Sequence, residues 1–203
     1  MYRIAVCISG RGSLLPPICE AIENGSLPAV IACVISDRPG TAGLERAEAA
    51  GIPALCIDRR KYRDPEGPSL SDAILQAVEG QADFIVLAGF LSILQGTILE
   101  KFTGKIINIH PALLPKHGGR GMYGMRVHQA VIESGDRMSG STVHFVTSGI
   151  DTGPIITQRS IEVLPEDTPD SLRHKVGGIE GDLLVEALRL VMAPLKEKRG
   201  VVK

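Results

Sequence analysis

RIAVCISGRGS (residues 3–13) is the stretch that decides the fold. Its first seven residues are mostly apolar, which is typical of a β-strand buried on both faces of a sheet. A glycine-rich turn follows, and the next residues have the pattern of a helix that ends near Glu23. Comparable apolar runs recur between helical segments at 29–36, 54–57, 84–88 and 105–109. This alternation predicts an α/β fold, with a mainly parallel sheet covered by helices on both faces.

The intervening helices are expected over 43–50, 72–79 and 95–102, and the rhythm changes after residue 110. A helix is predicted over 124–134, followed by two strands over 141–147 and 155–162 that can form an antiparallel edge. A long final helix is predicted over 168–192, interrupted around Gly177 and Gly178. No linker, repeat or low-complexity segment divides the sequence, so we expect one domain over residues 1–203.

The charge balance argues against several classes of protein. The 203 residues include 22 Lys and Arg against 23 Asp and Glu, so no overall positive charge favours nucleic acid or an anionic membrane. Aromatic residues make up 3% and tryptophan is absent, which argues against a stacking platform for single-stranded nucleic acid. We therefore expect small-molecule substrates, with no nucleic acid and no membrane as partners, and either a monomer or a homodimer.

The four cysteines, Cys7, Cys19, Cys33 and Cys56, lack the spacing of a zinc site, and no metal is expected. Cys7 and Cys33 fall inside apolar strands, where a reduced cysteine acts as a small apolar residue. The N-terminus has the pattern of a strand rather than of a signal peptide, and no apolar segment is long enough to span a bilayer. The expected location is therefore the reducing cytoplasm.

In parallel α/β sheets, ligands bind beyond the carboxyl ends of the strands, and the unusual residues of this sequence gather there. The turn from Ser9 to Ser13 follows the first strand and precedes the first helix. Its glycines let the backbone approach an anion, a helix N-terminus supplies free N–H groups, and Arg11 can add a charge-assisted bond. One interpretation is a phosphate site; the other is a plain turn in which Ser13 caps the helix.

The segment Asn108-Ile109-His110-Pro111 closes the fifth strand. Residues two apart in a strand face the same side, so the Asn108 amide and the His110 imidazole point the same way. Pro111 keeps His110 out of the helical region. An amide donor beside an imidazole suits stabilisation of an oxyanion and transfer of a proton, so we expect this pair to act in catalysis.

Asp151-Thr152-Gly153-Pro154 joins the two late strands, and its residue types are those of an ordinary β-turn. If this loop folds over Asn108 and His110, the Asp151 carboxylate can orient the imidazole and favour its charged form. The turn alone does not decide between these two interpretations.

For the remaining histidines, the sequence gives weaker predictions of a role in the site. His144 lies in an alternating strand and can face either the core or the site, and His117 lies in a glycine-rich loop. His128 and His174 fall in helical patterns, where a solvated position is the usual one. The loop itself, residues 116–126 (KHGGRGMYGMR), is expected to be mobile or to form a lid.

Taken in order, these segments resemble the glycinamide ribonucleotide formyltransferases of purine biosynthesis. The matching segments are ISGRGS (8–13), GLERA (43–47), LAGFLSIL (87–94), NIHPALLPK (108–116), STVHFVT (141–147) and DTGP (151–154). The resemblance covers nearly the whole chain and is most specific at NIHPALLPK with the downstream Asp151. It implies a Rossmann-like formyltransferase fold and a single formyltransferase catalytic domain over residues 1–203.

The resemblance also implies a reaction: a formyl group passes from the co-substrate 10-formyltetrahydrofolate to the amine of glycinamide ribonucleotide, without a metal. Asn108, His110 and Asp151 would be the catalytic trio, with Asn108 and a protonated His110 stabilising the oxyanion and Asp151 keeping His110 protonated. The residues implied near the ribonucleotide are Arg11, Gly12, Ser13, Leu14, Gly89, Pro111 and Glu180, of which Glu180 fits a surface charge equally well. Those implied near the folate are Leu91, Ser92, Ile93, Leu94, Thr147, Ser148, Gly149, Ile150 and Asp151.

Three features depart from the family pattern. The phosphate loop, commonly NGSN, is Arg11-Gly12-Ser13-Leu14 here, so two side-chain amides are replaced and Arg11 is expected to compensate with its charge. Many members have arginine at the position of Ser92. The glycine-rich stretch after Lys116 is longer than usual. None of these departures touches the catalytic trio.

Several alternatives use similar sequence features. Methionyl-tRNA formyltransferases carry an additional C-terminal domain, and formyltetrahydrofolate hydrolases carry an additional N-terminal one, so the chain length disfavours both. A nucleotide-binding module without catalysis would not need Asn108, His110 and Asp151. A Rossmann-type dehydrogenase is disfavoured because the GxGxxG motif is missing.

Overall fold

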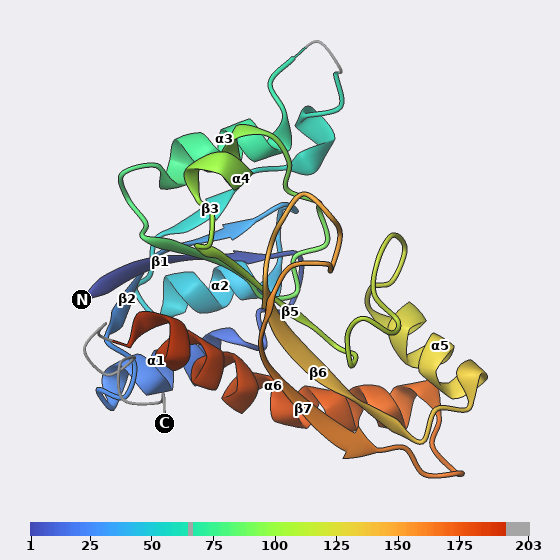
Figure 1. Ribbon diagram of the computed structural model, residues 1–203. Helices are drawn as coiled ribbons and strands as arrows, with labels where there is room; N and C mark the ends of the chain where they lie inside the picture. Colours follow the sequence, from blue (N-terminus) through green and yellow to red (C-terminus); the bar gives the residue numbers. More distant parts are fainter. Residues whose placement is uncertain (65–66, 194–203) are drawn as a thin grey trace, which may run out of the picture.

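The computed structural model describes residues 1–64 and 67–193, and the last ten residues of the expected domain lie outside this part. Within the described residues, seven strands form one sheet in the order β3-β2-β1-β4-β5-β6-β7 (Figure 1). The strands are β1 (Tyr2–Ile8), β2 (Ala29–Ser36), β3 (Ala54–Cys56), β4 (Phe84–Leu87), β5 (Ile106–His110), β6 (Met138–Phe145) and β7 (Ile155–Glu162). The first five pair in parallel, whereas β6 runs antiparallel to both β5 and β7. The predicted mainly parallel sheet with an antiparallel edge is confirmed.

Helices cover both faces of the sheet. On one face lie α1 (Leu15–Glu23), α2 (Ala42–Ala49) and α6 (Pro169–Met192). On the other lie α3 (Leu70–Val78) and α4 (Thr97–Lys101), and the short helix η1 (Arg59–Lys61) follows β3. The remaining helix, α5 (Met125–Ser134), packs against the N-terminal half of α6, away from the parallel strands (Figure 1).

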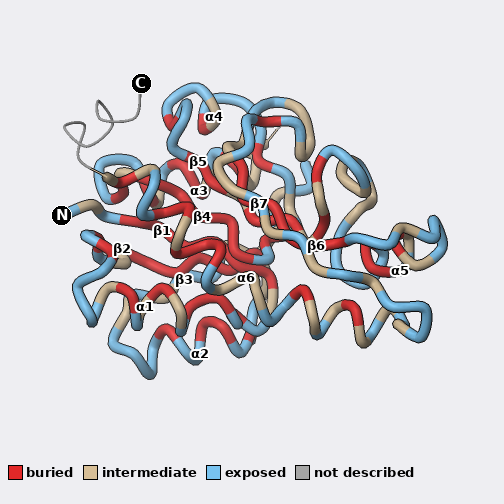
Figure 2. The backbone as a smooth tube through the Cα atoms, turned by 60° about the horizontal axis from the view of Figure 1, so that its bottom comes forward, coloured by how far each residue is buried: buried red, intermediate tan, exposed pale blue. Residues whose placement is uncertain are grey.

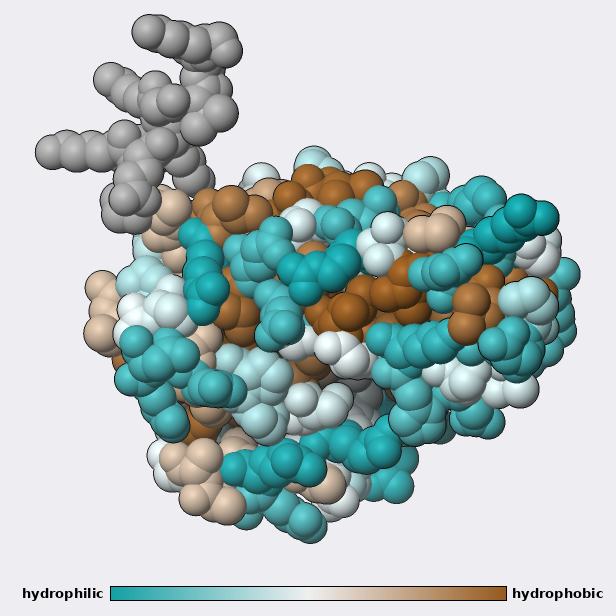
Figure 3. Space-filling view, turned by 90° about the horizontal axis from the view of Figure 1, so that it is seen from below, coloured by the Kyte–Doolittle hydropathy of each residue, from teal (hydrophilic) through white to brown (hydrophobic). Residues whose placement is uncertain are grey.

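The apolar runs of the central strands fill both sides of the sheet. In β1, Ile4, Val6 and Ile8 pack toward α1, α2 and α6, whereas Ala5 and Cys7 pack toward α3 and α4. Because successive side chains of a strand alternate between faces, a strand buried on both sides has to be apolar throughout. Figure 2 accordingly shows the buried positions concentrated along the central strands. From below, the surface carries an apolar band bordered by hydrophilic side chains (Figure 3).

Helix α6 runs without a break through Gly177 and Gly178, so the predicted interruption is wrong. Glycine lowers helix propensity by only about 1 kcal/mol per residue, and buried side chains on both sides of the pair outweigh that cost. Leu172 and Val176 precede the glycines, and Leu183 and Leu184 follow them, all fully buried. Tertiary packing therefore continues the helix where local propensity disfavours it.

The first turn of α1 also differs from expectation. Leu14, not Ser13, is the N-cap, and its side chain makes no capping hydrogen bond. Pro16 and Pro17 stand in the first helical positions, where a missing backbone N–H costs nothing. Ser13 is therefore left exposed on the turn instead of capping the helix.

The turn after β1 is held by close packing against the start of α2. The Gly43 N–H donates to the Gly10 carbonyl at 3.1 Å. A Cβ atom added at Gly43 would overlap the Ile8 side chain and approach the Gly10 oxygen to 2.9 Å. Only glycine fits this contact between β1, its turn and α2.

Replacing Gly43 with alanine is expected to lower the free energy of unfolding by about 1–3 kcal/mol, because the added methyl group overpacks this contact. The same replacement at Gly178, where an added Cβ meets no atom within 4 Å, serves as the matched control. It is expected to raise the free energy of unfolding by roughly 0.5–1 kcal/mol through helix propensity. Urea unfolding of both variants measures the two effects, and equal effects of the same sign would contradict the packing described.

Candidate active site

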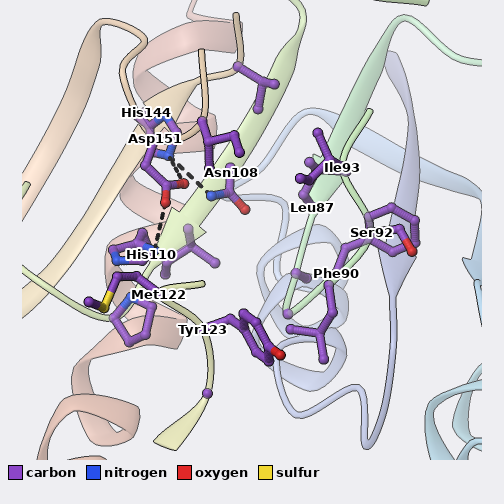
Figure 4. A pocket seen from close by; sticks show the side chains of 18 of the residues that line it. Leu87, Phe90, Ser92, Ile93, Asn108, His110, Met122, Tyr123, His144 and Asp151 are labelled. Atoms are coloured by element: carbon purple, nitrogen blue, oxygen red, sulfur yellow. Dashed lines mark hydrogen bonds and ion pairs between the residues drawn. The ribbon is translucent and has the colours of Figure 1, made fainter. Parts of the chain in front are cut away.

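A pocket of about 680 Å³ opens at the carboxyl ends of β4 and β5 (Figure 4). The turn after β1, the loop after β6, the glycine-rich loop before α5 and one face of α6 complete its lining. Asn108, His110 and Asp151 all line this pocket, so the structure brings the three residues together as predicted. Sequence positions more than forty residues apart therefore meet at the sheet edge expected for a ligand.

His110 ends β5 and is buried, with 4% of its surface exposed. Its Nε2 lies 2.8 Å from the His117 carbonyl oxygen, which can only accept, so Nε2 carries a proton and donates. Its Nδ1 lies 3.6 Å from Asp151 Oδ2. The ring is thus held by a hydrogen bond at Nε2, and Nδ1, which faces the carboxylate, is the nitrogen left to exchange a proton with a bound molecule.

Burial lowers the pKa of His110, and the Asp151 charge and the bond to the His117 carbonyl oppose this shift only in part. His110 is therefore mainly neutral at neutral pH. Burial therefore opposes the expected effect of Asp151, since the loss of solvation lowers the pKa of His110 while the carboxylate at 3.6 Å raises it. A neutral Nδ1 is suited to accept a proton.

Asp151 occupies a left-handed backbone conformation, with φ of 55°. Its Oδ2 accepts the Gly119 N–H at 2.9 Å, which ties the glycine-rich loop to the site. Burial raises the pKa of Asp151, whereas His110 and the Gly119 N–H lower it, and the pKa lies below its usual value. Asp151 is therefore a carboxylate at neutral pH, and it faces His110.

Asn108 and His144 lie directly opposite each other on the paired strands β5 and β6. The Asn108 Nδ2 is 3.1 Å from the His144 Nε2. His144 is 1% exposed and lines the pocket, so of its two possible orientations the structure shows the one toward the site.

The glycine-rich loop is held at its base by charged contacts. His117 Nε2 and Lys116 Nζ each lie 2.8 Å from a carboxylate oxygen of Asp136, which precedes β6. Further along the loop, the guanidinium of Arg126 lies 5.1 Å from the centre of the Tyr123 ring. Met122 and Tyr123 of this loop line the pocket together with His110 (Figure 4), so the loop forms part of its wall.

The residues implied for the ribonucleotide and the folate line the same pocket, with one exception. The exception is Gly12, which is buried, has φ of 64° and does not line the pocket. A Cβ atom added to it would meet the Cα atom of Gly43. Arg11 and Ser13 are exposed at the rim. Ser92, at a position where arginine is common in the resembled family, donates to Asp37 Oδ2 at 2.5 Å.

Several lining residues were not predicted. They are Arg120, Met122, Tyr123, Arg126, His128 and Arg173. The expected solvated position of His128 is wrong, since it is 3% exposed, and burial together with Arg173 and His110 lowers its pKa to about 4. His128 lies three residues before the buried Val131, and this helical spacing, which places both on one face of α5, could have indicated that His128 is buried. Arg173 stands two helical turns before Glu180, a spacing that places both on one face.

Glu180 lies on the pocket face of α6, and burial raises its pKa to about 7. The surface interpretation of this residue is therefore not supported. His174, in contrast, is exposed as expected.

The described part of the chain lacks two further features. Residues 1–64 and 67–193 contain no group of three or more His, Cys, Asp or Glu side chains arranged to hold a metal ion. No helix within these ranges combines the length and apolar content needed to cross a membrane.

Comparison with known proteins assigns the family. The model of the formyl transferase family matches residues 2–188. This chain belongs to that family. A phosphoribosylglycinamide formyltransferase of Haemophilus influenzae is 43% identical over 176 residues, covering 86% of this chain and 80% of the relative. A chloroplastic phosphoribosylglycinamide formyltransferase of Arabidopsis thaliana is 38% identical over 92% of this chain, which spans 64% of that relative's length.

A solved structure supports the same assignment. Glycinamide ribonucleotide transformylase 1 of Symbiobacterium toebii is 37% identical and superposes with a TM-score of 0.87, covering 100% of this chain and 91% of the other. The Rossmann-like α/β arrangement of this chain is therefore shared with a transformylase of known structure.

Replacing Glu180 with glutamine is expected to stabilise the protein increasingly as the pH rises. The raised folded-state pKa means that the unfolded chain ionises Glu180 from its ordinary value of 4.5, whereas the folded protein keeps the proton until about 7. The wild-type protein therefore loses stability across this window, and the variant does not. The difference should reach about 1–3 kcal/mol above the folded-state pKa. Urea unfolding of both proteins across the window measures it, and a difference that does not change with pH would contradict the assignment.

Proposed function

We propose that this protein transfers the formyl group of 10-formyltetrahydrofolate to the amine of glycinamide ribonucleotide. The products are formylglycinamide ribonucleotide and tetrahydrofolate, a step of de novo purine biosynthesis. The observation that carries the proposal is the convergence of Asn108, His110 and Asp151 in one pocket. The names of the similar enzymes from Haemophilus influenzae and Symbiobacterium toebii support the choice of substrates.

The amine nitrogen attacks the formyl carbon, and the carbonyl electron pair moves to oxygen, giving a tetrahedral oxyanion. The Asn108 amide can donate one N–H to this oxygen while its other N–H bonds His144. A donor fixed in a buried site before the reaction needs no reorganisation when charge develops. Removing such a donor typically lowers the rate by roughly 10²–10³.

His110 and Asp151 take up the proton that the amine loses and return it to the folate nitrogen. The neutral Nδ1 of His110 accepts it, and the imidazolium then faces the Asp151 carboxylate at 3.6 Å. When the intermediate collapses, the carbon–nitrogen bond to the folate breaks, and the folate nitrogen takes up a proton from the same pair. Proton transfer by a positioned group of this kind contributes about 10²–10⁴ to the rate.

The two substrates are assigned to opposite parts of the pocket. The ribonucleotide phosphate lies at the turn from Arg11 to Leu14, with Glu180 near the sugar hydroxyls. The folate lies against residues 91–94 and the loop 147–151, whose lining combines apolar side chains with backbone polar groups. This arrangement brings the amine and the formyl group together beside His110.

The remaining assignments follow from the same proposal. The enzyme acts on small molecules as one catalytic domain over residues 1–203, as a monomer or a homodimer. A cytoplasmic location is supported by the bacterial relative, whereas the Arabidopsis thaliana relative is named as chloroplastic.

The proposal is tested by mixing the purified protein with 10-formyltetrahydrofolate and following the folate product optically, with and without glycinamide ribonucleotide. Turnover is expected only when the ribonucleotide is present. Replacing His110 with alanine should lower kcat by about 10²–10⁴, because no group then accepts the proton, and should leave ribonucleotide binding largely intact. Turnover without the ribonucleotide would favour a hydrolase, and normal turnover of the variant would remove His110 from the mechanism.

A further inference from the structure

His144 makes two hydrogen bonds that together determine where its proton lies. Its Nδ1 is 2.9 Å from the carbonyl oxygen of Phe145, and its Nε2 is 3.1 Å from Nδ2 of Asn108. A carbonyl oxygen only accepts, so Nδ1 carries the proton. An amide nitrogen only donates, so Nε2 carries none. The two contacts are mutually consistent for a neutral ring with its proton on Nδ1.

The nearby carboxylate does not reverse this assignment. Asp151 Oδ1 lies 3.7 Å from the His144 Nε2, which is beyond hydrogen-bond distance, whereas Asn108 lies within it. Oδ2 of the same carboxylate already accepts the Gly119 N–H at 2.9 Å and faces His110. Oδ2 therefore has other partners, and Oδ1 is too distant from Nε2 of His144 to prevent it from accepting from Asn108.

The alternative state has a defined chemical consequence. A proton on Nε2 of His144 would require an acceptor, and the Asn108 amide would meet it by turning its oxygen toward the ring. The amide oxygen and nitrogen would then exchange places, and the N–H that the proposed function directs at the formyl oxygen would be lost. An oxygen in its place would repel the developing oxyanion instead of stabilising it.

We infer that His144 is a positioning residue, which holds the Asn108 amide with an N–H directed at the reacting formyl oxygen. The inference rests on the proposed function for the identity of the oxyanion. It assigns His144 no contact with either substrate. The antiparallel pairing of β5 and β6 sets the two side chains opposite each other, so the contact is built into the sheet.

The proton position is measurable without any substrate. Nitrogen-15 NMR of the labelled protein distinguishes a protonated ring nitrogen from a bare one. The expected spectrum at neutral pH shows a protonated Nδ1 and a bare Nε2 for His144, assigned by comparison with a His144→Gln variant. A proton on Nε2 would overturn the inference, whatever the enzyme acts on.

Kinetics test whether His144 acts through Asn108. His144→Met keeps an apolar side chain of similar bulk but removes the acceptor, and is expected to lower kcat by about 10- to 100-fold with both KM values little changed. In an Asn108→Ala background the same replacement should cause no further loss, because the amide that it positions is gone. Equal losses in the two backgrounds would overturn the inference.

Two further variants separate positioning from folding. His144→Gln places an oxygen near the former Nε2 and is expected to recover at least tenfold in kcat over His144→Met; no recovery would count against the inference. His174→Met, at an exposed position of α6 outside the pocket, is the matched control and should keep the wild-type kcat. A wild-type protein without ribonucleotide-dependent turnover would refute the proposed function, while the NMR result would still decide the position of the proton.

Discussion

The carboxylate of Asp151 lies within 4 Å of two imidazoles and accepts a backbone N–H, with distances of 3.6 Å to His110, 3.7 Å to His144 and 2.9 Å to Gly119. It therefore connects three separate segments: β5, β6 and the glycine-rich loop. A buried charge is costly unless it is paired and hydrogen-bonded, so each of these partners also stabilises the others. Asp151 takes this position in a left-handed backbone conformation, which Asp tolerates in turns.

The antiparallel edge of the sheet provides the framework for this arrangement. After α5 the chain returns as β6, which pairs antiparallel with β5 and places His144 opposite Asn108. The loop from β6 to β7 then carries Asp151 back over the end of β5. His144 of β6 thus contacts Asn108, and Asp151 of the loop after β6 faces His110. Asn108 and His110 both line the pocket. The parallel half of the sheet supplies the turn after β1 and the segment after β4 that complete the lining.

The sequence predicts the parts of this structure that depend on local pattern. The apolar runs of β1 and β2 and the antiparallel edge are confirmed, and Asn108 and His110 are recognisable because polar residues seldom end an apolar strand without a role. Other features depend on tertiary packing, which a local pattern does not contain. The continuous α6 relies on buried leucines on either side of its glycines, and the lowered pKa of His110 follows from the burial of its ring. The identity of the expected substrates came from the resemblance to a family and not from the periodicity of the sequence.

The central claim is that the trio transfers a formyl group to the ribonucleotide and does not release it to water. The most direct test uses 10-formyltetrahydrofolate labelled with carbon-13 in the formyl group and follows the label by NMR in the presence of glycinamide ribonucleotide. The account predicts that the label appears as a formamide on the glycinamide nitrogen, in an amount equal to the tetrahydrofolate formed. Label that accumulates as free formate, with the ribonucleotide unchanged, would contradict it.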